Sequence, residues 1–471
     1  MLFRNYLRHF GLNHCAYKRI GLGLVSNLNE SAQTSNEVES SYEESDSLEN
    51  PQPVKLSPKQ KHINKINTFY NAYPHLTPFK NFLPASYLFQ KPAMKDKLRI
   101  FLIDKEVACD IMKKLQAHLE TYSGHVIEIG AGAGVLTEEL LKTQLQNLRI
   151  YEPDSDLYDH LKKLIELHKS SARLIKADLQ HLGNIIKSDA LTNGDKMRMI
   201  FDGLPSLNWE DEPAVKVIGA MPNERFIAHI MLSITLQTGL CQLGRPELFL
   251  MFPADIYEKL TSNPSNQKNY RSNCVAFQVL FDHEELARLP EKAFVPWCAN
   301  PRSKNKSKEN KEASDNVCLV RITPKRDLLQ RISPDLLRNF LYFVKFMMRK
   351  QSASLIDLME RWVPGCGVRL ITRGYTIYTD CGSLTPDEYL EIFLEFTSWP
   401  EFSSSSFILS AESFLGGLLQ NDLQEELFSD AKFSRLFHRE TNVPEEEEEV
   451  FDNNANLELR DKSINTDIQG G

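Results

Sequence analysis

Short apolar runs alternate with amphipathic segments between residues 125 and 282. The runs are six or seven residues long and rich in β-branched side chains, which is typical of buried strands. The segments between them, such as 135–144 and 154–168, place apolar residues at helical spacing. This alternation predicts an α/β fold of parallel βαβ units, with helices on both faces of one sheet. The five runs are HVIEIG, LRIYEP, ARLIKAD, KVIGAMP and ELFLMFP.

Two further apolar runs, at 275–282 (VAFQVLFD) and 317–324 (VCLVRITP), predict two more strands towards the far edge of the sheet. Between them lies a polar, lysine-rich stretch at 301–316, which we expect to be a loop. Ser333 and Pro334 are a good N-cap and first-turn pair. Helical periodicity continues from there, so we expect a smaller all-α domain at the C-terminal end.

The two ends of the chain differ in composition from the middle. The first 25 residues carry four Lys/Arg, no acid and apolar residues at helical spacing, which favours a mitochondrial transit peptide over an ordinary basic helix. A Ser/Glu/Asn-rich stretch follows, and the run PEEEEEV lies near the C-terminus; both predict disorder. The expected divisions are a transit peptide at 1–25, a linker at 26–53, a basic arm at 54–99, the α/β domain at 100–325, the helical domain at 326–438 and an acidic tail at 439–471.

Composition narrows the class of protein. With 471 residues, 42% of them apolar, the chain can bury a large core. No apolar run reaches the roughly 18 residues of a membrane helix, so we expect no membrane partner. We also expect the protein to be a monomer. The eight cysteines are scattered without a CxxC pair, which argues against a zinc ribbon or a disulfide framework and favours a reducing compartment.

The net charge of −8 hides a basic segment. Residues 54–99 hold nine Lys/Arg against one acid, interleaved with seven aromatic residues. Cations hold phosphates and aromatic rings stack on unpaired bases, so this mixture suits single-stranded nucleic acid. The alternative, equally weighted, is a solvated arm whose aromatic rings pack onto the core.

A glycine-rich turn follows the first predicted strand in EIGAGAGVL, with glycines at positions 130, 132 and 134. A dinucleotide site needs its third glycine one position later, where Val135 stands. GxGxG after Glu128 instead fits S-adenosylmethionine, which has no pyrophosphate. The next two strands end at Glu152, placed to accept the ribose hydroxyls, and at Asp178, placed to bind the adenine amine. The alternative is a purely structural role, in which the glycines only shape a turn.

The order FLID, EIGAGAG, YEPD, KAD and VIGAMP resembles the ribosomal RNA adenine N6-dimethyltransferase family, to which the mitochondrial transcription factor B proteins also belong. The resemblance covers roughly residues 80–437. It implies a Rossmann-like class I methyltransferase domain, dependent on S-adenosylmethionine, with a C-terminal all-α domain. It also implies that the methyl donor is contacted by Leu102, Gly130, Gly132, Glu152 and Asp178.

The chain departs from this family at the acceptor-binding motif, Asn-Leu-Pro-Tyr or Phe, which falls on Ala220, Met221, Pro222 and Asn223. Family members hold the target amine with the Asn side chain and a backbone carbonyl, and stack the aromatic ring on the flipped base. Ala220 offers no side-chain acceptor and Asn223 no ring, although Phe226 is a candidate substitute for the ring. Losing both contacts, at about 1–3 kcal/mol each, predicts a reaction slower by roughly two to four orders of magnitude.

The departure has a functional implication within the resemblance. Among the mitochondrial members, one paralogue resembles an ordinary dimethyltransferase and the other works mainly in transcription initiation. The altered motif, the predicted transit peptide and the lysine-rich stretch make this chain resemble the second, which implies partnership with the single-subunit mitochondrial RNA polymerase and promoter DNA in the matrix nucleoid. The alternatives are a small-subunit rRNA adenine dimethyltransferase and a structural ribosome-assembly factor.

Several residues outside the donor site are candidates for contact with nucleic acid, among them a basic pair and a tryptophan. Arg349 and Lys350 match a basic pair of the family and are placed to bind phosphate, unless they only cover the core with their stems. Trp297 matches a family turn near the acceptor side, but a core position is the more common role for such a residue.

Overall fold

The computed structural model describes residues 57–72, 74–80, 99–143, 145–192, 194–295 and 316–420. It divides the chain into two compact units, Met1–Lys61 and His62–Gly471. The predicted transit peptide, linker and acidic tail lie outside the described residues, as does the lysine-rich loop except for its last position. Those four assignments stay predictions.

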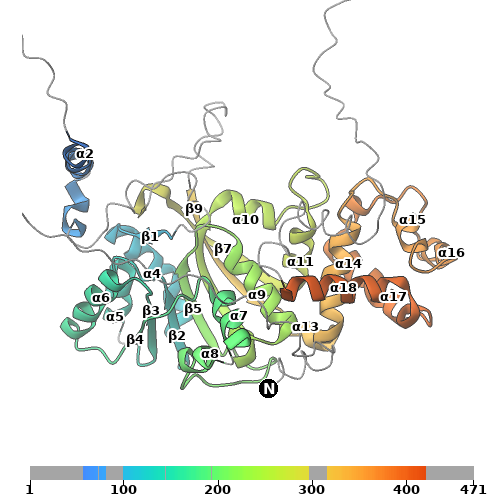
Figure 1. Ribbon diagram of the computed structural model, residues 1–471, viewed down its shortest axis with the longest axis horizontal. Coiled ribbons are helices and arrows are strands. Elements are labelled where there is room, and N and C mark those ends of the chain that lie inside the picture. Colours follow the sequence, from blue (N-terminus) through green and yellow to red (C-terminus); the bar gives the residue numbers. More distant parts are fainter. Residues whose placement is uncertain are drawn as a thin grey trace, which may run out of the picture. The chain divides into compact units, whose positions relative to one another are not determined.

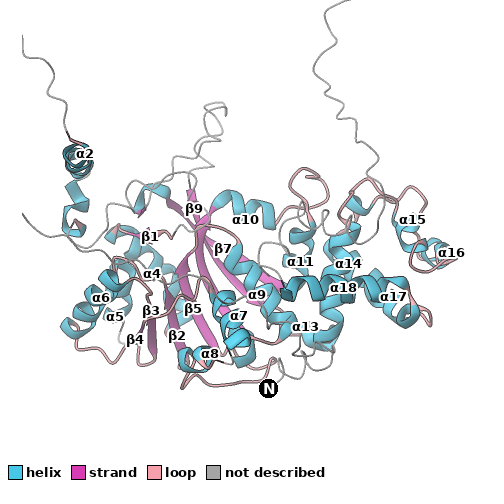
Figure 2. Ribbon diagram, viewed as in Figure 1, coloured by secondary structure: helices cyan, strands magenta, loops and turns pink. Residues whose placement is uncertain are grey.

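A seven-stranded sheet is the centre of the second unit (Figures 1 and 2). Its order is β4-β3-β2-β5-β6-β9-β7, and the first five strands are parallel. β9 and β7 add an antiparallel edge. The strands are β2 His125–Ile129, β3 Leu148–Tyr151, β4 Arg173–Ile175, β5 Val215–Ala220, β6 Pro246–Pro253, β7 Phe281–Pro290 and β9 Asn316–Pro324. The five parallel strands confirm the five strand predictions.

Helices cover both faces of this sheet because alternate side chains of each central strand point to opposite faces. Val126, Ile150 and Ile218 belong to one core cluster, whereas Ile127, Tyr151 and Val217 belong to another. The first cluster contains the apolar faces of α4 Lys105–Leu119, α5 Val135–Lys142 and α6 Ser155–Leu167. The second contains those of α7 Leu182–Thr192, α8 Lys196–Ile200, α9 Arg225–Leu236, α10 Ala254–Leu260 and α11 Ser272–Leu280.

The predicted strand at 275–282 is wrong. Most of it belongs to α11, and β7 begins only at Phe281. A short run in which nearly every residue is apolar carries no periodicity that separates a buried strand from a buried helix. Here Val275, Phe277 and Val279 are all buried, because helices pack around α11 on several sides. The strand lies instead in the charged sequence FDHEELARLP, at the sheet edge where exposed side chains are tolerated.

The C-terminal helices share a core with the sheet domain. Ser333 caps α14 Pro334–Met347 by accepting a hydrogen bond from the amide of Leu336, which confirms the predicted helix start. α14 packs against α9 and α11, so its buried aromatic side chains join the second core cluster. The other helices of this part are α13 Leu328–Arg331, α15 Leu355–Glu360, α16 Gly367–Thr372, α17 Pro386–Ser398 and α18 Ser406–Gln420. The domain boundary at 325/326 stays a prediction.

Two aromatic residues of the basic arm are part of the core. The arm contains α2 Pro58–Ala72, which spans the division between the two units, and a short 3-10 helix at Pro74–Phe79. Tyr70 and Phe79 are buried in the first core cluster. For these two rings the packing alternative holds, and stacking on bases is wrong. Five of the six described cysteines are also buried, as expected for small core residues.

Within the described ranges, no helix combines the length and apolarity needed to cross a bilayer. The same ranges contain no cluster of His, Cys, Asp or Glu suited to a metal ion.

Candidate functional site

The sequence candidates meet at the carboxyl edge of the parallel strands. The chain runs from β2 outwards through β3 to β4 and then crosses back to β5 on the other side of β2. The strand order reverses between the ends of β2 and β5, the usual ligand position in open α/β sheets. Gly130 directly follows β2, and Met221 directly follows β5. The donor and acceptor motifs therefore lie side by side.

All three glycines of the loop have left-handed backbone conformations. The φ angles are +64° at Gly130, +57° at Gly132 and +76° at Gly134, a region that side chains with a Cβ adopt only under strain. A Cβ on Gly132 would clash with the ring of Phe101. Phe101 belongs to β1 Phe101–Leu102, so this contact brings the predicted donor residue Leu102 to the loop. Leu102 itself is buried and pairs with Phe294 of β8 Phe294–Val295.

Glu152 holds the glycine loop from the end of β3. One carboxylate oxygen accepts a hydrogen bond from the amide of Gly132 at 3.0 Å, and the other accepts one from the amide of Asp154 at 2.9 Å. The Glu152 side chain has no exposed surface. Burial raises the pKa of Glu152, against the opposing effect of these two N–H donors and the nearby charge of Arg99.

Asp178 lies after β4, on the same edge. It accepts a hydrogen bond from the amide of Gln180 at 3.1 Å and lies 3.0 Å from Nδ1 of His181. Burial opposes the ionisation of Asp178, but His181 and the cation of Arg99 outweigh it and lower the pKa of this carboxyl group. Asp178 is therefore a carboxylate at neutral pH and can accept a hydrogen bond from an amine.

Arg99 is the site residue that sequence reasoning missed. Its guanidinium lies 2.6 Å from Asp178 and 3.7 Å from Glu152, so one cation bridges the two acids predicted to bind the nucleoside. The sequence counted Arg99 only as the last cation of the basic arm. Its position two residues before the FLID motif could have marked Arg99 as a site residue, but nothing in the sequence identifies its ion-pair partners.

A second buried acid, Glu128, lies within β2 beneath the loop. Its carboxyl group accepts a hydrogen bond from the hydroxyl of Thr137 at 2.7 Å and is almost fully buried. Burial raises the pKa of Glu128 to about 8, so the group is largely protonated at neutral pH. Glu128 thus supports the turn as a neutral group and is not a ligand carboxylate.

The residues at this edge fit S-adenosylmethionine. Left-handed glycines let the backbone approach a ligand closely, and two carboxylates at successive strand ends match the ribose hydroxyls and the adenine amine. Gly130, Gly132, Glu152 and Asp178 would hold the donor, which supplies an electrophilic methyl group on a sulfonium when bound. The structure brings these four residues together as the sequence predicts.

The acceptor turn is closed by its own contacts. Ala220 is buried at the end of β5, and its carbonyl accepts a hydrogen bond from the Gln180 side chain at 3.0 Å. The Asn223 side-chain oxygen accepts one from the amide of Arg225 at 3.0 Å, at the start of α9. Met221 is buried, and the proline at 222 between them is half-buried.

The suggestion that Phe226 replaces the missing ring is wrong. Phe226 is only 2% exposed and lies in the second core cluster among the apolar residues of α9. Sequence spacing placed it one turn from the motif but did not fix its direction. On a helix buried on most sides, that turn faces the core.

Arg349 and Lys350 lie just beyond the C-terminus of α14 and are exposed. Partial desolvation and then the charge of Arg361 lower the pKa of Arg349, whose guanidinium lies 6.0 Å from the Phe346 ring centre. The two cations are accessible to phosphate, and their role stays a prediction. Trp297 lies outside the described residues.

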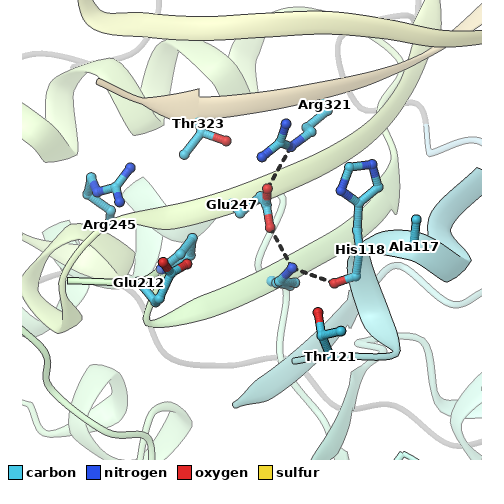
Figure 3. A pocket seen from close by; sticks show the side chains of 10 residues that line it. Ala117, His118, Thr121, Glu212, Arg245, Glu247, Arg321 and Thr323 are labelled. Atoms are coloured by element: carbon cyan, nitrogen blue, oxygen red, sulfur yellow. Dashed lines mark hydrogen bonds and ion pairs between the residues drawn. The ribbon is translucent and has the colours of Figure 1, made fainter. Parts of the chain in front are cut away.

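A polar cavity of about 260 Å³ lies at the opposite, amino-terminal edge of the sheet (Figure 3). Glu247 there binds Lys216 at 2.8 Å and Arg321 at 2.6 Å, and Arg245 donates to three backbone carbonyls. Burial opposes ionisation of Glu247, but Lys216 and Arg321 outweigh it and lower its pKa. These paired charges tie together the starts of β5 and β6 and the end of α4. The cavity is remote from the glycine loop.

Comparison with known proteins agrees with this geometry. The family model described as ribosomal RNA adenine dimethylase matches residues 95–398, more than half of the chain. The chain is 30% identical over 425 residues to dimethyladenosine transferase 2, mitochondrial, of Drosophila melanogaster, covering 78% of this chain and 92% of that protein. It is 27% identical over 213 residues to mitochondrial dimethyladenosine transferase 1 of Bos taurus, covering 44% of this chain and 58% of that protein.

Solved structures show a more distant likeness. A dimethyladenosine transferase from Plasmodium falciparum is 13% identical, with a TM-score of 0.41, over 63% of this chain and 97% of that one. The 23S rRNA methyltransferase ErmE is 15% identical, with a TM-score of 0.38, over 62% of this chain and 98% of that one. The fold is a Rossmann-like methyltransferase α/β domain followed by helices, and the family match extends into that helical part. The chain therefore belongs to the ribosomal RNA adenine dimethylase family and, by its similarity over most of its length to a dimethyladenosine transferase 2, to the mitochondrial dimethyladenosine transferases within that family.

Proposed function

We propose that the protein is a mitochondrial transcription initiation factor with weak or no methyltransferase activity. It works in the matrix nucleoid with the single-subunit mitochondrial RNA polymerase, helping to melt promoter DNA and to hold the opened strand. The relatives named as mitochondrial proteins and the basic, acid-free N-terminus support this location.

The acceptor turn is the observation that carries the proposal. Base methylation requires a flipped adenine whose amine is held at the sulfonium carbon. Ala220 brings no side-chain acceptor, and its carbonyl is already bonded to Gln180. Asn223 brings no ring, and its side-chain oxygen is bonded to the start of α9. A site with these contacts holds an adenine poorly, although the donor residues are in place.

Strand holding has different requirements from catalysis. It depends on cations that follow the phosphate backbone and on stacking surfaces, and it needs no general base. Arg349 and Lys350 are exposed cations on the described part of the helical region and suit the first requirement. The polymerase supplies the chemistry of RNA synthesis, so a damaged acceptor site is no disadvantage in this role.

Run-off transcription with the cognate polymerase tests the proposal. On a linear duplex promoter, we expect initiation to require this protein and to be unaffected by saturating S-adenosylhomocysteine. On the same promoter with a pre-opened bubble, the requirement should fall sharply because melting is bypassed. Equal initiation on the duplex template with and without the protein would refute the proposal.

The intact donor side favours a second candidate function, small-subunit rRNA adenine N6-dimethylation with S-adenosylmethionine. The left-handed glycines and the Glu152–Gly132 hydrogen bond are the supporting observations. Primer extension across the conserved hairpin adenines after depletion of the protein separates the two functions. Loss of the methylation stop, restored by the wild-type chain, would identify an active enzyme.

A further inference from the structure

Arg99 occupies the position where a nucleoside would meet its two carboxylates. Its guanidinium touches Asp178 at 2.6 Å and lies 3.7 Å from Glu152, and its side chain is 19% exposed. Both acids come from strand ends that face the glycine loop. A cation between two carboxylates presents several N–H donors to the oxygens that ribose hydroxyls and an adenine amine would otherwise use.

We infer that Arg99 is an internal competitor for the nucleoside end of the donor pocket. A donor molecule reaches Glu152 and Asp178 only when this guanidinium moves away from them. The exchange replaces the Arg99–Asp178 hydrogen bond and the Arg99–Glu152 ion pair, in which both partners are charged, with hydrogen bonds to the same carboxylates from neutral hydroxyl and amine groups, which are weaker. The wild-type chain therefore binds adenosine-containing ligands more weakly than its complete set of donor residues would give.

The remaining contacts of the two acids agree with this reading. Glu152 keeps its backbone donors from Gly132 and Asp154, and Asp178 keeps the Gln180 amide and His181, when Arg99 moves away. The carboxylates therefore stay oriented without the arginine. Arg99 lies in the two residues before β1, so its movement does not require a strand of the large sheet to break.

Calorimetric titration of the full chain with S-adenosylhomocysteine tests the inference, with Arg99→Gln as the main variant. Glutamine removes the charge and keeps a polar side chain, so we expect about a tenfold gain in affinity. Arg99→Lys restores the charge without the planar fork and should fall between Arg99→Gln and the wild type. Arg173→Gln is the matched control, because Arg173 lies on β4 and pairs with Asp202 instead of the two acids.

A truncated ligand shows whether Arg99 acts at the nucleoside end or at the amino-acid end of the bound ligand. 5′-Methylthioadenosine carries the nucleoside without the amino-acid group, and Arg99→Gln should improve its binding by a similar factor. An unchanged or lower affinity of Arg99→Gln for both ligands would overturn the inference. So would a gain confined to S-adenosylhomocysteine, because Arg99 would then act at the amino-acid end. If thermal unfolding shows that Arg99→Gln is misfolded, the affinity of Arg99→Lys compared with that of the wild type decides the matter. The outcome does not depend on transcription, so it can fail while the proposed function stands.

Discussion

The donor loop and the acceptor turn lie at the ends of neighbouring strands, β2 and β5, yet they differ in what their residues can still do. In the donor loop, left-handed glycines and two strand-end carboxylates form a connected set of contacts. In the acceptor turn, Ala220 and Asn223 use their polar atoms for contacts within the chain. The donor loop keeps the residue types that bind a methyl donor, with Arg99 in contact with its two acids, whereas the acceptor turn has lost the family's amide and aromatic ring.

This difference indicates that the donor half and the acceptor half of the site depend on different structural requirements. The donor half is part of the β2–α5 connection, so its glycines are needed for the fold whether or not a ligand binds. The acceptor half is the turn after β5, where Ala220 and Met221 are buried in the core but Asn223 is only half-buried. Loss of a substrate contact there leaves the sheet unchanged, which explains how the fold persists with an altered motif.

The largest expected effect is on the donor loop. Gly132→Ala forces a Cβ into a left-handed position and against the ring of Phe101, so it should lower the free energy of unfolding by roughly 2–5 kcal/mol. Gly374→Ala is the control, because Gly374 also has positive φ but no heavy atom within 4 Å of an added Cβ. We expect about 1–2 kcal/mol there. Equal losses in urea unfolding would mean that the Phe101 contact does not constrain the loop.

Restoring the acceptor turn should raise catalysis. Ala220→Asn combined with Asn223→Phe returns the amide and the ring, and each contact contributes about 1–3 kcal/mol. We expect methyl transfer to a small-subunit rRNA hairpin to increase by roughly 100-fold, measured with radiolabelled donor. Asn223→Phe alone should give a smaller gain. A folded double variant without any gain would place the defect outside this turn.

Glu128 predicts a pH dependence that belongs to the donor side. Its pKa is about 8 in the folded chain and near 4.5 when exposed, so the folded state holds the extra proton between these values. Stability therefore falls as pH rises, by about 1.4 kcal/mol per unit at most. From pH 6.5 to pH 8 we expect a loss of about 2 kcal/mol in urea unfolding. Glu128→Gln should remove that slope; an unchanged slope would contradict the assignment to Glu128.

The smallest effect concerns strand holding. Charge reversal of both Arg349 and Lys350 should weaken binding to a single-stranded oligonucleotide by roughly tenfold and reduce the salt slope by about 1.4, at about 0.7 per lost phosphate contact. Lys113→Glu combined with Lys114→Glu is the control for total charge, because it reverses two cations that are exposed on α4. Fluorescence anisotropy across a salt series measures both quantities. An unaltered slope in the double variant would assign the two cations to the helix surface only.

Much of the donor side could be predicted from the sequence because its signals are local. A strand followed by GxGxG fixes a turn with positive φ, and strand ends in a parallel sheet meet at one edge. Gly130, Gly132, Glu152 and Asp178 follow from these two rules. The start of α14 at Ser333 and Pro334 is equally local, since a cap contacts only the next turn.

The failures have a common cause. The run at 275–282 is apolar except for Gln278 and Asp282, so its secondary structure depended on whether helices or strands surround it. The direction of Phe226 depended on which face of α9 packs against the core. Tyr70 and Phe79 are residue types that also stack on bases, and only their burial shows that they belong to the core.

The sequence by itself determined the five parallel strands and the helices between them, the methyl-donor loop and the altered acceptor motif. Only the tertiary structure decided that Arg99 meets Asp178, 79 positions away, and that Gln180 bonds to the carbonyl of Ala220, 40 positions away. A local pattern constrains backbone conformation, because its causes lie within a few residues. The partner of a charged or amide side chain depends on which distant elements fold beside it, and no spacing along the chain encodes that choice.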